Sequence, residues 1–129
     1  MAKLTRKGAV RKLDSLCKEI VHTRDKDTCR KCGIFVSEFG GNVHHIIPKK
    51  RGYHVRWDIN NLILLCATCH FWWHKDPTAI LWLRDNDPFV FEVIQEINKG
   101  ETESYKLRDL LKIIVTLTKF RDLIGVKNE

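Results

Sequence analysis

The first quarter of the chain alternates between apolar and polar positions with the period of a helix. From about residue 9 to residue 24, apolar side chains return at every third or fourth position, which is typical of an amphipathic helix packed on a core. The positions of this stripe are Leu13, Leu16, Cys17, Ile20 and Val21. We therefore predict a helix over residues 9–24, in which Cys17 is a buried core thiol.

Short apolar runs in the middle of the chain predict strands. The runs at 34–39 and 43–47 are rich in β-branched and aromatic residues and flank two consecutive glycines, a pattern typical of a β-hairpin. Residues 48–59 are mostly polar and predict a long loop. Residues 62–65 are wholly apolar and predict a buried strand, and residues 67–75 predict a helix.

Two Asp-Pro pairs indicate where further helices begin. An aspartate that caps a helix, followed by proline at the first helical position, is a common helix start. The pair at 76–77 predicts a helix to about residue 85, and the pair at 87–88 predicts a helix to about residue 99. An apolar repeat from Leu107 predicts a final helix to about residue 124, which either closes the core or contacts another subunit.

The length and composition are those of a small globular protein. A chain of 129 residues with 43% apolar residues suits one domain with a short appendage. We place the main domain at residues 1–85 and a C-terminal helical extension at 86–129. The chain has no apolar run of about 18 residues, so we expect no membrane contact. The basic N-terminus lacks the apolar stretch of a secretory signal, so we expect a cytoplasmic protein.

The net charge of +7 is distributed unevenly along the chain. Residues 1–75 contain 15 lysines and arginines and 6 acidic residues, whereas residues 76–129 contain 8 and 10. A basic segment attracts polyanions such as DNA, although charge alone is equally consistent with a solvated surface. The first part of the chain is therefore the candidate part for binding nucleic acid.

Four of the five cysteines form two Cys-x-x-Cys pairs, Cys29 with Cys32 and Cys66 with Cys69. Disulfides are rare in a reducing compartment, and two such turns are typical of a tetrahedral zinc site. A site with four thiolates has no open position for water, so we expect a structural Zn²⁺ ion coupled to folding. An iron–sulfur cluster is a minor alternative.

Histidines gather around these cysteine pairs. His44 and His45 are neighbours on a predicted strand, so their side chains point to opposite faces and can take different roles. His70 and His74 lie four positions apart on a predicted helix, so both rings can reach one metal ion. Phosphodiester hydrolysis requires a cation and an activated water, and neutral histidine is a suitable base. The pattern therefore predicts a hydrolytic metal site.

The order of these motifs resembles the HNH endonucleases. The resemblance rests on the first cysteine pair, on His-His-Ile-Ile-Pro at 44–48, and on Asn61-Leu62-x-x-Leu65-Cys66-x-x-Cys69-His70. It implies an α+β fold with a zinc-stapled ββα-metal core, also called a His-Me finger, between an N-terminal helix and a C-terminal helical extension.

The same resemblance implies a role for each polar residue of the motifs. His45 is the general base, and His44 and His70 are ligands of the catalytic cation. His74 is a further ligand, as in toxin nucleases that use such a histidine pair. Asn61 either fixes the loop that carries the base or ligates the metal. The cation is Mg²⁺ or Mn²⁺, although several imidazoles also favour another divalent transition metal.

Basic residues lie beside these motifs and predict contacts with DNA phosphates. They follow the predicted base-carrying strand or lie in the first cysteine turn. The predicted contacts are Lys49, Lys50, Arg51, Arg56, Arg30 and Lys31. We expect the aromatic residues Phe71, Trp72, Trp73 and Trp82 to supply core area rather than to stack on bases.

A second resemblance, to the phage NinG family of recombination nucleases that includes the Rap nuclease, covers more of the chain. It rests on Arg56-Trp57-Asp58-x-x-Asn61, on Cys69-His70-Phe71-Trp72-Trp73, and on Asp76-Pro77 with Trp82. It implies cutting of branched DNA, such as Holliday junctions or D-loops, in a phage or prophage context. Symmetric cutting of a junction would favour a homodimer.

Two other functions stay open. One is a nicking or packaging-associated nuclease with less selectivity for DNA structure. The other is a zinc-ribbon adaptor that binds DNA without catalysis, although an adaptor needs only the four cysteines and no second cluster of metal ligands.

Overall fold

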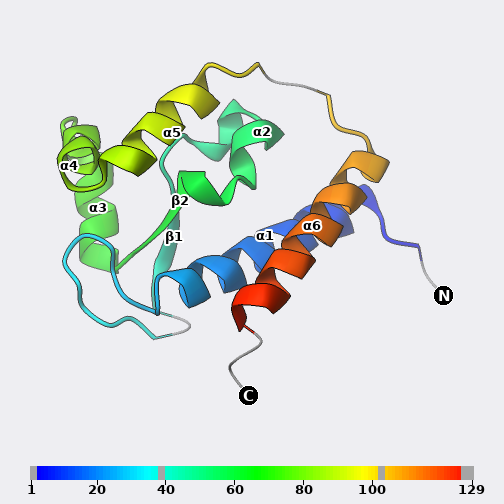
Figure 1. Ribbon diagram of the computed structural model, residues 1–129, viewed down its shortest axis with the longest axis horizontal. Coiled ribbons are helices and arrows are strands. Elements are labelled where there is room, and N and C mark those ends of the chain that lie inside the picture. Colours follow the sequence, from blue (N-terminus) through cyan, green and yellow to red (C-terminus); the bar gives the residue numbers. More distant parts are fainter. Residues whose placement is uncertain (1–2, 38–39, 102–103, 126–129) are drawn as a thin grey trace.

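The computed structural model describes residues 3–37, 40–101 and 104–125. Helices surround a small central sheet (Figure 1). The elements are α1 (Arg6–Arg24), β1 (Asn42–His45), α2 (Tyr53–Arg56), β2 (Leu62–Leu65), α3 (Ala67–Lys75), α4 (Ala79–Asn86), α5 (Pro88–Asn98) and α6 (Leu107–Gly125). Short 3-10 turns at Lys49–Arg51 and Ile59–Asn61 lie before and after α2. None of the helices in the described ranges is both long and apolar enough to cross a membrane.

Strands β1 and β2 form an antiparallel sheet in which His44 lies opposite Ile63 and His45 lies opposite Leu62. All four residues of β2 are buried, because helices cover both faces of the sheet. Helix α3 packs on the face that carries His44, and α1 packs on the face that carries His45. This arrangement, with its N-terminal and C-terminal helices, confirms the predicted α+β fold.

The predicted hairpin between residues 34–39 and 43–47 is wrong, because β1 pairs with β2 instead. Residues 38–39 of the first run lie outside the described residues. The rest of that run pairs with the segment before the first cysteine, where Val36 donates its backbone N–H to the carbonyl of Asp27 at 2.7 Å. Its backbone groups are therefore used within the cysteine turn and leave β1 free to pair with a more distant strand.

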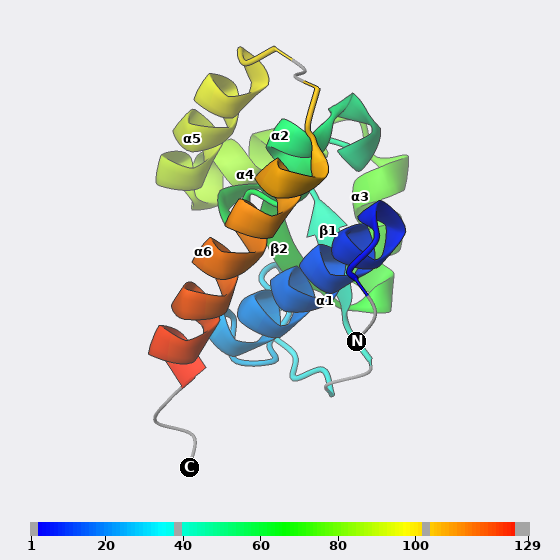
Figure 2. The same ribbon diagram turned by 90° about the vertical axis from the view of Figure 1, so that its right-hand side faces the viewer.

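Helices α1 and α6 lie side by side in both views of the molecule (Figures 1 and 2). Leu110 and Leu117 of α6 are buried in the same apolar core as Leu13 and Leu16 of α1. The final helix was expected either to close the core or to contact another subunit. The structure shows that α6 closes the core of its own chain.

Capping side chains determine where helices α1 and α5 begin. The Thr5 hydroxyl caps α1, which begins at Arg6, earlier than predicted. Asp87 caps α5 in the predicted way. Asp76 does not cap α4, because it ends α3 instead, and α4 begins only at Ala79.

The buried carboxylate of Asp25 connects the end of α1 to the first cysteine turn and to β2. Its Oδ1 accepts hydrogen bonds from Nε of Arg24 at 2.8 Å and from Nη1 of Arg30 at 3.1 Å. Its Oδ2 accepts the backbone N–H of Leu64 at 3.1 Å. Nη2 of Arg30 also donates to Asp87 at 2.7 Å, so the same network reaches the start of α5.

We expect the Asp25→Ala variant to lose about 3 kcal/mol of unfolding free energy, because a buried N–H and a partly buried guanidinium lose their carboxylate partner. Urea unfolding of the zinc-loaded protein measures this loss. The control is Glu96→Ala, which removes only an exposed pair with Lys99 and should cost less than about 1 kcal/mol. Equal losses in the two variants would contradict the role given to Asp25.

Candidate active site

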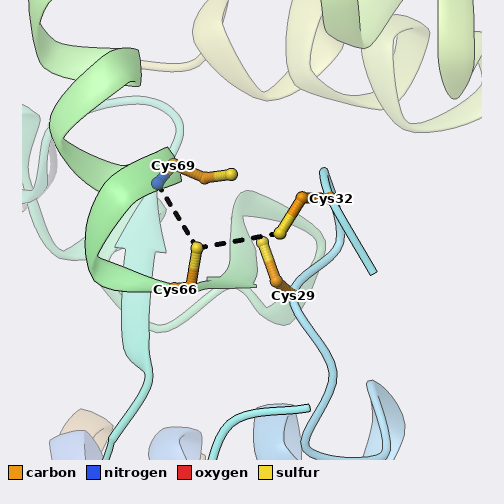
Figure 3. A group of neighbouring side chains, drawn as sticks. All are labelled: Cys29, Cys32, Cys66 and Cys69. Carbon is orange, nitrogen blue, oxygen red and sulfur yellow. Dashed lines mark hydrogen bonds between the residues drawn. The ribbon is translucent and has the colours of Figure 1, made fainter. Parts of the chain in front are cut away.

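Four cysteine side chains converge beside the N-terminus of α3, two from the turn after α1 and two from α3 and the residue before it (Figure 3). Their sulfur atoms all lie within 4.8 Å of one another. Sγ of Cys32 lies 3.8 Å from Sγ of Cys66. Cys32 is exposed, whereas Cys29, Cys66 and Cys69 are buried. The structure thus brings together the four cysteines predicted to form one cluster.

Local backbone geometry points the sulfur atoms inward. Gly33 has φ of +83°, in the left-handed region that favours glycine, and donates its N–H to the carbonyl of Cys29 at 2.9 Å. On the other side of the cluster, Sγ of Cys66 caps α3 by accepting the backbone N–H of Cys69 at 3.4 Å. Each Cys-x-x-Cys segment is therefore folded as a tight turn around the same point.

The thiols differ in their readiness to ionise. Burial works to raise the pKa of Cys29, but backbone hydrogen bonds from Cys32, Cys66 and Lys31 outweigh it and lower the pKa to about 6. Burial and hydrogen bonds with the neighbouring thiols raise the pKa of Cys69. Four thiolates this close together need a cation to offset their mutual repulsion. Zn²⁺ with four sulfur ligands fits this donor set.

A second cluster lies between the sheet and α3. It consists of His44 from β1 and of His70 and His74 from α3, and their nearest ring nitrogens all lie within 4.8 Å of one another. Nε2 of His70 lies 3.1 Å from Nε2 of His74. The ring centroid of His44 lies 5.2 Å from that of His70 and 5.3 Å from that of His74. Three imidazoles with this arrangement suit one divalent metal ion.

The environment of His44 favours this use. The residue is 3% exposed, and its Nε2 is buried without a hydrogen-bond partner among the described residues. Burial lowers the pKa of His44 to about 3, with smaller contributions from His70 and His74. Burial, together with His74, also lowers the pKa of His70. Both rings are therefore neutral at pH 7, the form that binds a metal, and a cation would satisfy the buried Nε2 of His44.

His45 does not join this cluster, because it lies on the opposite face of β1. Its Nε2 lies 3.0 Å from the carbonyl oxygen of Arg56. A carbonyl only accepts hydrogen bonds, so Nε2 carries the proton, and Nδ1 of the neutral ring is an acceptor with no partner among the residues that the structure describes. Burial lowers the pKa of His45, although the hydrogen bond to Arg56 opposes this effect. A neutral imidazole with a free nitrogen can accept a proton from water.

The side chain of Asn61 ties the backbone that follows β1 to the backbone of α2. It is fully buried, and its Oδ1 accepts the N–H of Ile47 at 2.7 Å. Its Nδ2 donates to the carbonyl of Ile47 at 2.9 Å and to the carbonyl of Val55 at 3.0 Å. Of the two roles considered for Asn61, these contacts support fixing the loop that follows β1.

Residues 29–75 match the family model described as HNH endonuclease. The matched segment contains both the cysteine cluster and the histidine cluster. It is an HNH domain. The comparisons with curated proteins and with solved structures gave no match. Helices α1, α4, α5 and α6 lie outside the matched segment and surround the HNH domain (Figure 1).

The basic residues predicted to contact DNA fall into two groups around the HNH domain. Lys49 and Lys50 are exposed in the turn after β1. The other four have contacts within the chain: Arg30 with Asp25 and Asp87, Arg51 with Asn98, Arg56 with Asp14, and Lys31 with the ring of Trp72. The two lysines are therefore the better placed for phosphates, and DNA contact by all six residues stays a prediction.

Two of the four aromatic residues expected to supply core area do so. Trp73 and Trp82 pack against a small apolar cluster formed by Ile47, Val55, Leu83 and Ile94. Trp72 is half-buried but belongs to neither apolar cluster of the described residues. The expectation is wrong for Phe71, which is 64% exposed. It lies on the exposed face of α3 together with Lys75.

Sequence reasoning missed two carboxylates that support the HNH domain. Asp25 fixes the first cysteine turn, and Asp14 of α1 accepts hydrogen bonds from Arg56 and from the indole of Trp57. Hydrogen bonds from Arg56 and Trp57 outweigh partial burial and lower the pKa of Asp14. Neither aspartate belongs to a motif. The one available signal was the position of Asp14, a carboxylate next to the apolar stripe of α1.

Proposed function

We propose that the chain is a metal-dependent endonuclease that hydrolyses phosphodiester bonds of DNA. The observation that carries this proposal is the cluster of His44, His70 and His74, whose ligand atoms lie within 4.8 Å of one another inside the HNH domain. These residues would hold one divalent cation. When bound, such an ion supplies positive charge to the scissile phosphate and to the departing oxygen.

His45 is the proposed general base. Its protonated Nε2 is held by the carbonyl of Arg56, so Nδ1 accepts the proton of the attacking water. His44 and His45 are the last two residues of β1, so we place the scissile phosphate at that end of the strand. Asn61 keeps the backbone after His45 in place, which preserves this geometry.

Lys49 and Lys50 are the proposed phosphate contacts nearest the site. They follow β1 within the HNH domain and are exposed. Positive charge at this position would orient the duplex and make binding weaken as salt increases.

We propose branched recombination intermediates as the preferred DNA, as the motif resemblance to phage recombination nucleases implies. The exposed Phe71 beside the histidine cluster supports this choice, because an apolar side chain can insert where bases are unstacked. A nuclease with less selectivity for structure would need no such residue.

A cleavage assay with matched sequences tests both proposals. We expect the protein with Mg²⁺ or Mn²⁺ to cut a Holliday junction at least about tenfold faster than a flap or a linear duplex. EDTA should abolish cutting of all three substrates. Equal rates on the three substrates would retain the endonuclease and remove the branch selectivity. Tight binding without cutting in any divalent cation would favour the zinc-ribbon adaptor.

A further inference from the structure

The end of α2 is held by side chains from three other parts of the chain. The last carbonyls of a helix have no partners within it. Here the carbonyl of Val55 accepts from Nδ2 of Asn61 at 3.0 Å, and that of Arg56 accepts from Nε2 of His45 at 3.0 Å. The orientation of the His45 ring therefore depends on where the backbone of residues 55–57 lies.

Asp14 of α1 holds the side chains of this same segment. Its Oδ2 accepts from Nη2 of Arg56 at 2.7 Å, and its Oδ1 accepts from Nε of Arg56 at 3.1 Å. The same Oδ1 accepts from Nε1 of Trp57 at 2.8 Å, and Trp57 is only 4% exposed. Two adjacent residues are thus tied to one carboxylate in a two-pronged ion pair and an indole hydrogen bond, a geometry with little freedom.

Open space adjoins this arrangement on the face of β1 that carries His45. Asp14, Lys18, His45, Lys49 and Arg56 are among the residues that line a pocket of about 280 Å³ between α1 and the sheet. The His45 ring is half-buried and borders this pocket, so open space rather than packed side chains lies against part of it. The hydrogen bond to the carbonyl of Arg56 restrains the ring on its other side.

We propose that Asp14 is a positioning residue for His45, acting through Arg56 and Trp57 from a helix outside the HNH domain. Asp14 fixes the end of α2, the carbonyl of Arg56 then holds the Nε2 proton, and Nδ1 is presented in one orientation. This inference rests on the proposed endonuclease function for its catalytic consequence. Its structural part, control of the His45 ring, does not depend on cleavage.

The first test follows the Nε2 proton of His45 by NMR in the zinc-loaded protein without Mg²⁺ or Mn²⁺. In Asp14→Ala we expect this proton to exchange with water at least about tenfold faster than in the wild type. Asp14→Asn preserves the shape and one acceptor oxygen and should fall between the two. The matched control is Glu19→Ala on the same helix, which removes a surface pair with Arg121 and should leave the exchange rate unchanged.

The second test measures cleavage by the same variants. We expect Asp14→Ala to lower kcat by about tenfold to a hundredfold with little change in KM, because a misplaced base slows the chemical step and not DNA binding. Asp14→Glu should restore most of the lost activity. Thermal unfolding of each variant distinguishes a slower chemical step from a loss of folded protein. If Asp14→Ala does not fold, the kcat of Asp14→Asn is measured in its place.

The outcomes separate this inference from the proposed function. Wild-type exchange and wild-type kcat in folded Asp14→Ala or Asp14→Asn would overturn it, as would equal changes in Glu19→Ala. A wild-type protein that cuts no DNA would refute the endonuclease proposal. The NMR measurement would still decide in that case whether Asp14 holds His45.

Discussion

Replacing His45 with alanine is expected to slow DNA cleavage by at least about 10²-fold, because the attacking water loses its proton acceptor. The histidine cluster stays intact in this variant, since His45 lies on the opposite face of β1 from His44. Metal and DNA should therefore bind as in the wild type. Single-turnover cleavage, calorimetric metal binding and a DNA-binding titration measure the three quantities separately.

The matched control is His54→Ala. His54 lies in α2, within the HNH domain, and no catalytic role is given to it. The variant should cut at close to the wild-type rate. Unchanged cleavage by His45→Ala would falsify the assignment of the base. Loss of DNA binding together with cleavage would instead place His45 among the residues that hold the substrate.

Removing zinc is expected to unfold the HNH domain, because binding of a four-thiolate site contributes on the order of 10 kcal/mol to folding in small zinc domains. The cysteine turn, β2 and the start of α3 are joined at this cluster, and Arg30 donates its backbone N–H to the carbonyl of Leu64 at 2.8 Å beside it. A chelator titration followed by circular dichroism measures the loss of structure.

Substitution at single cysteines distinguishes the cluster from other thiols. Cys69→Ser should weaken zinc binding and fold stability, whereas Cys17→Ala should retain both, since Cys17 is a buried thiol of α1 apart from the cluster. Replacement of zinc by Co²⁺ reports thiolate ligation through the sulfur-to-cobalt charge-transfer band in the near ultraviolet, which histidine ligands do not give. A protein that keeps its helices and its melting temperature without zinc would contradict this prediction.

Local sequence signals predicted the parts of the site that are built from local structure. The spacing of His70 and His74 places both rings on one face of α3, and the helix has the predicted bounds of 67–75. Each cysteine pair is a turn by itself, so the sequence predicted that the two sulfur atoms of a pair would face one metal ion. Such features depend on a few consecutive residues, so their geometry can be derived without knowing the rest of the fold.

Contacts between distant segments could not be derived in this way. The segment before β1 is equally suited to a hairpin, and only the hydrogen bonds of the cysteine turn show why β1 pairs with β2. Arg30 and Arg56 were predicted from their charge to contact phosphates, but Asp87 and Asp14, which pair with them, are far away in the sequence. Charge patterns show which residues are cationic and not whether a carboxylate neutralises them.

The position of α1 has a consequence for where a minimal fragment of this protein can be cut. The family pattern starts at Cys29, yet one face of the two-stranded sheet packs on α1, and Leu13, Leu16 and Ile20 belong to the same core as Leu62 and Leu64. An excised 29–75 peptide would expose that leucine-rich face to water and would tend to aggregate. The boundaries of the recognisable module are therefore not those of the unit that folds, and a graft of this HNH domain into another scaffold must bring a substitute for α1.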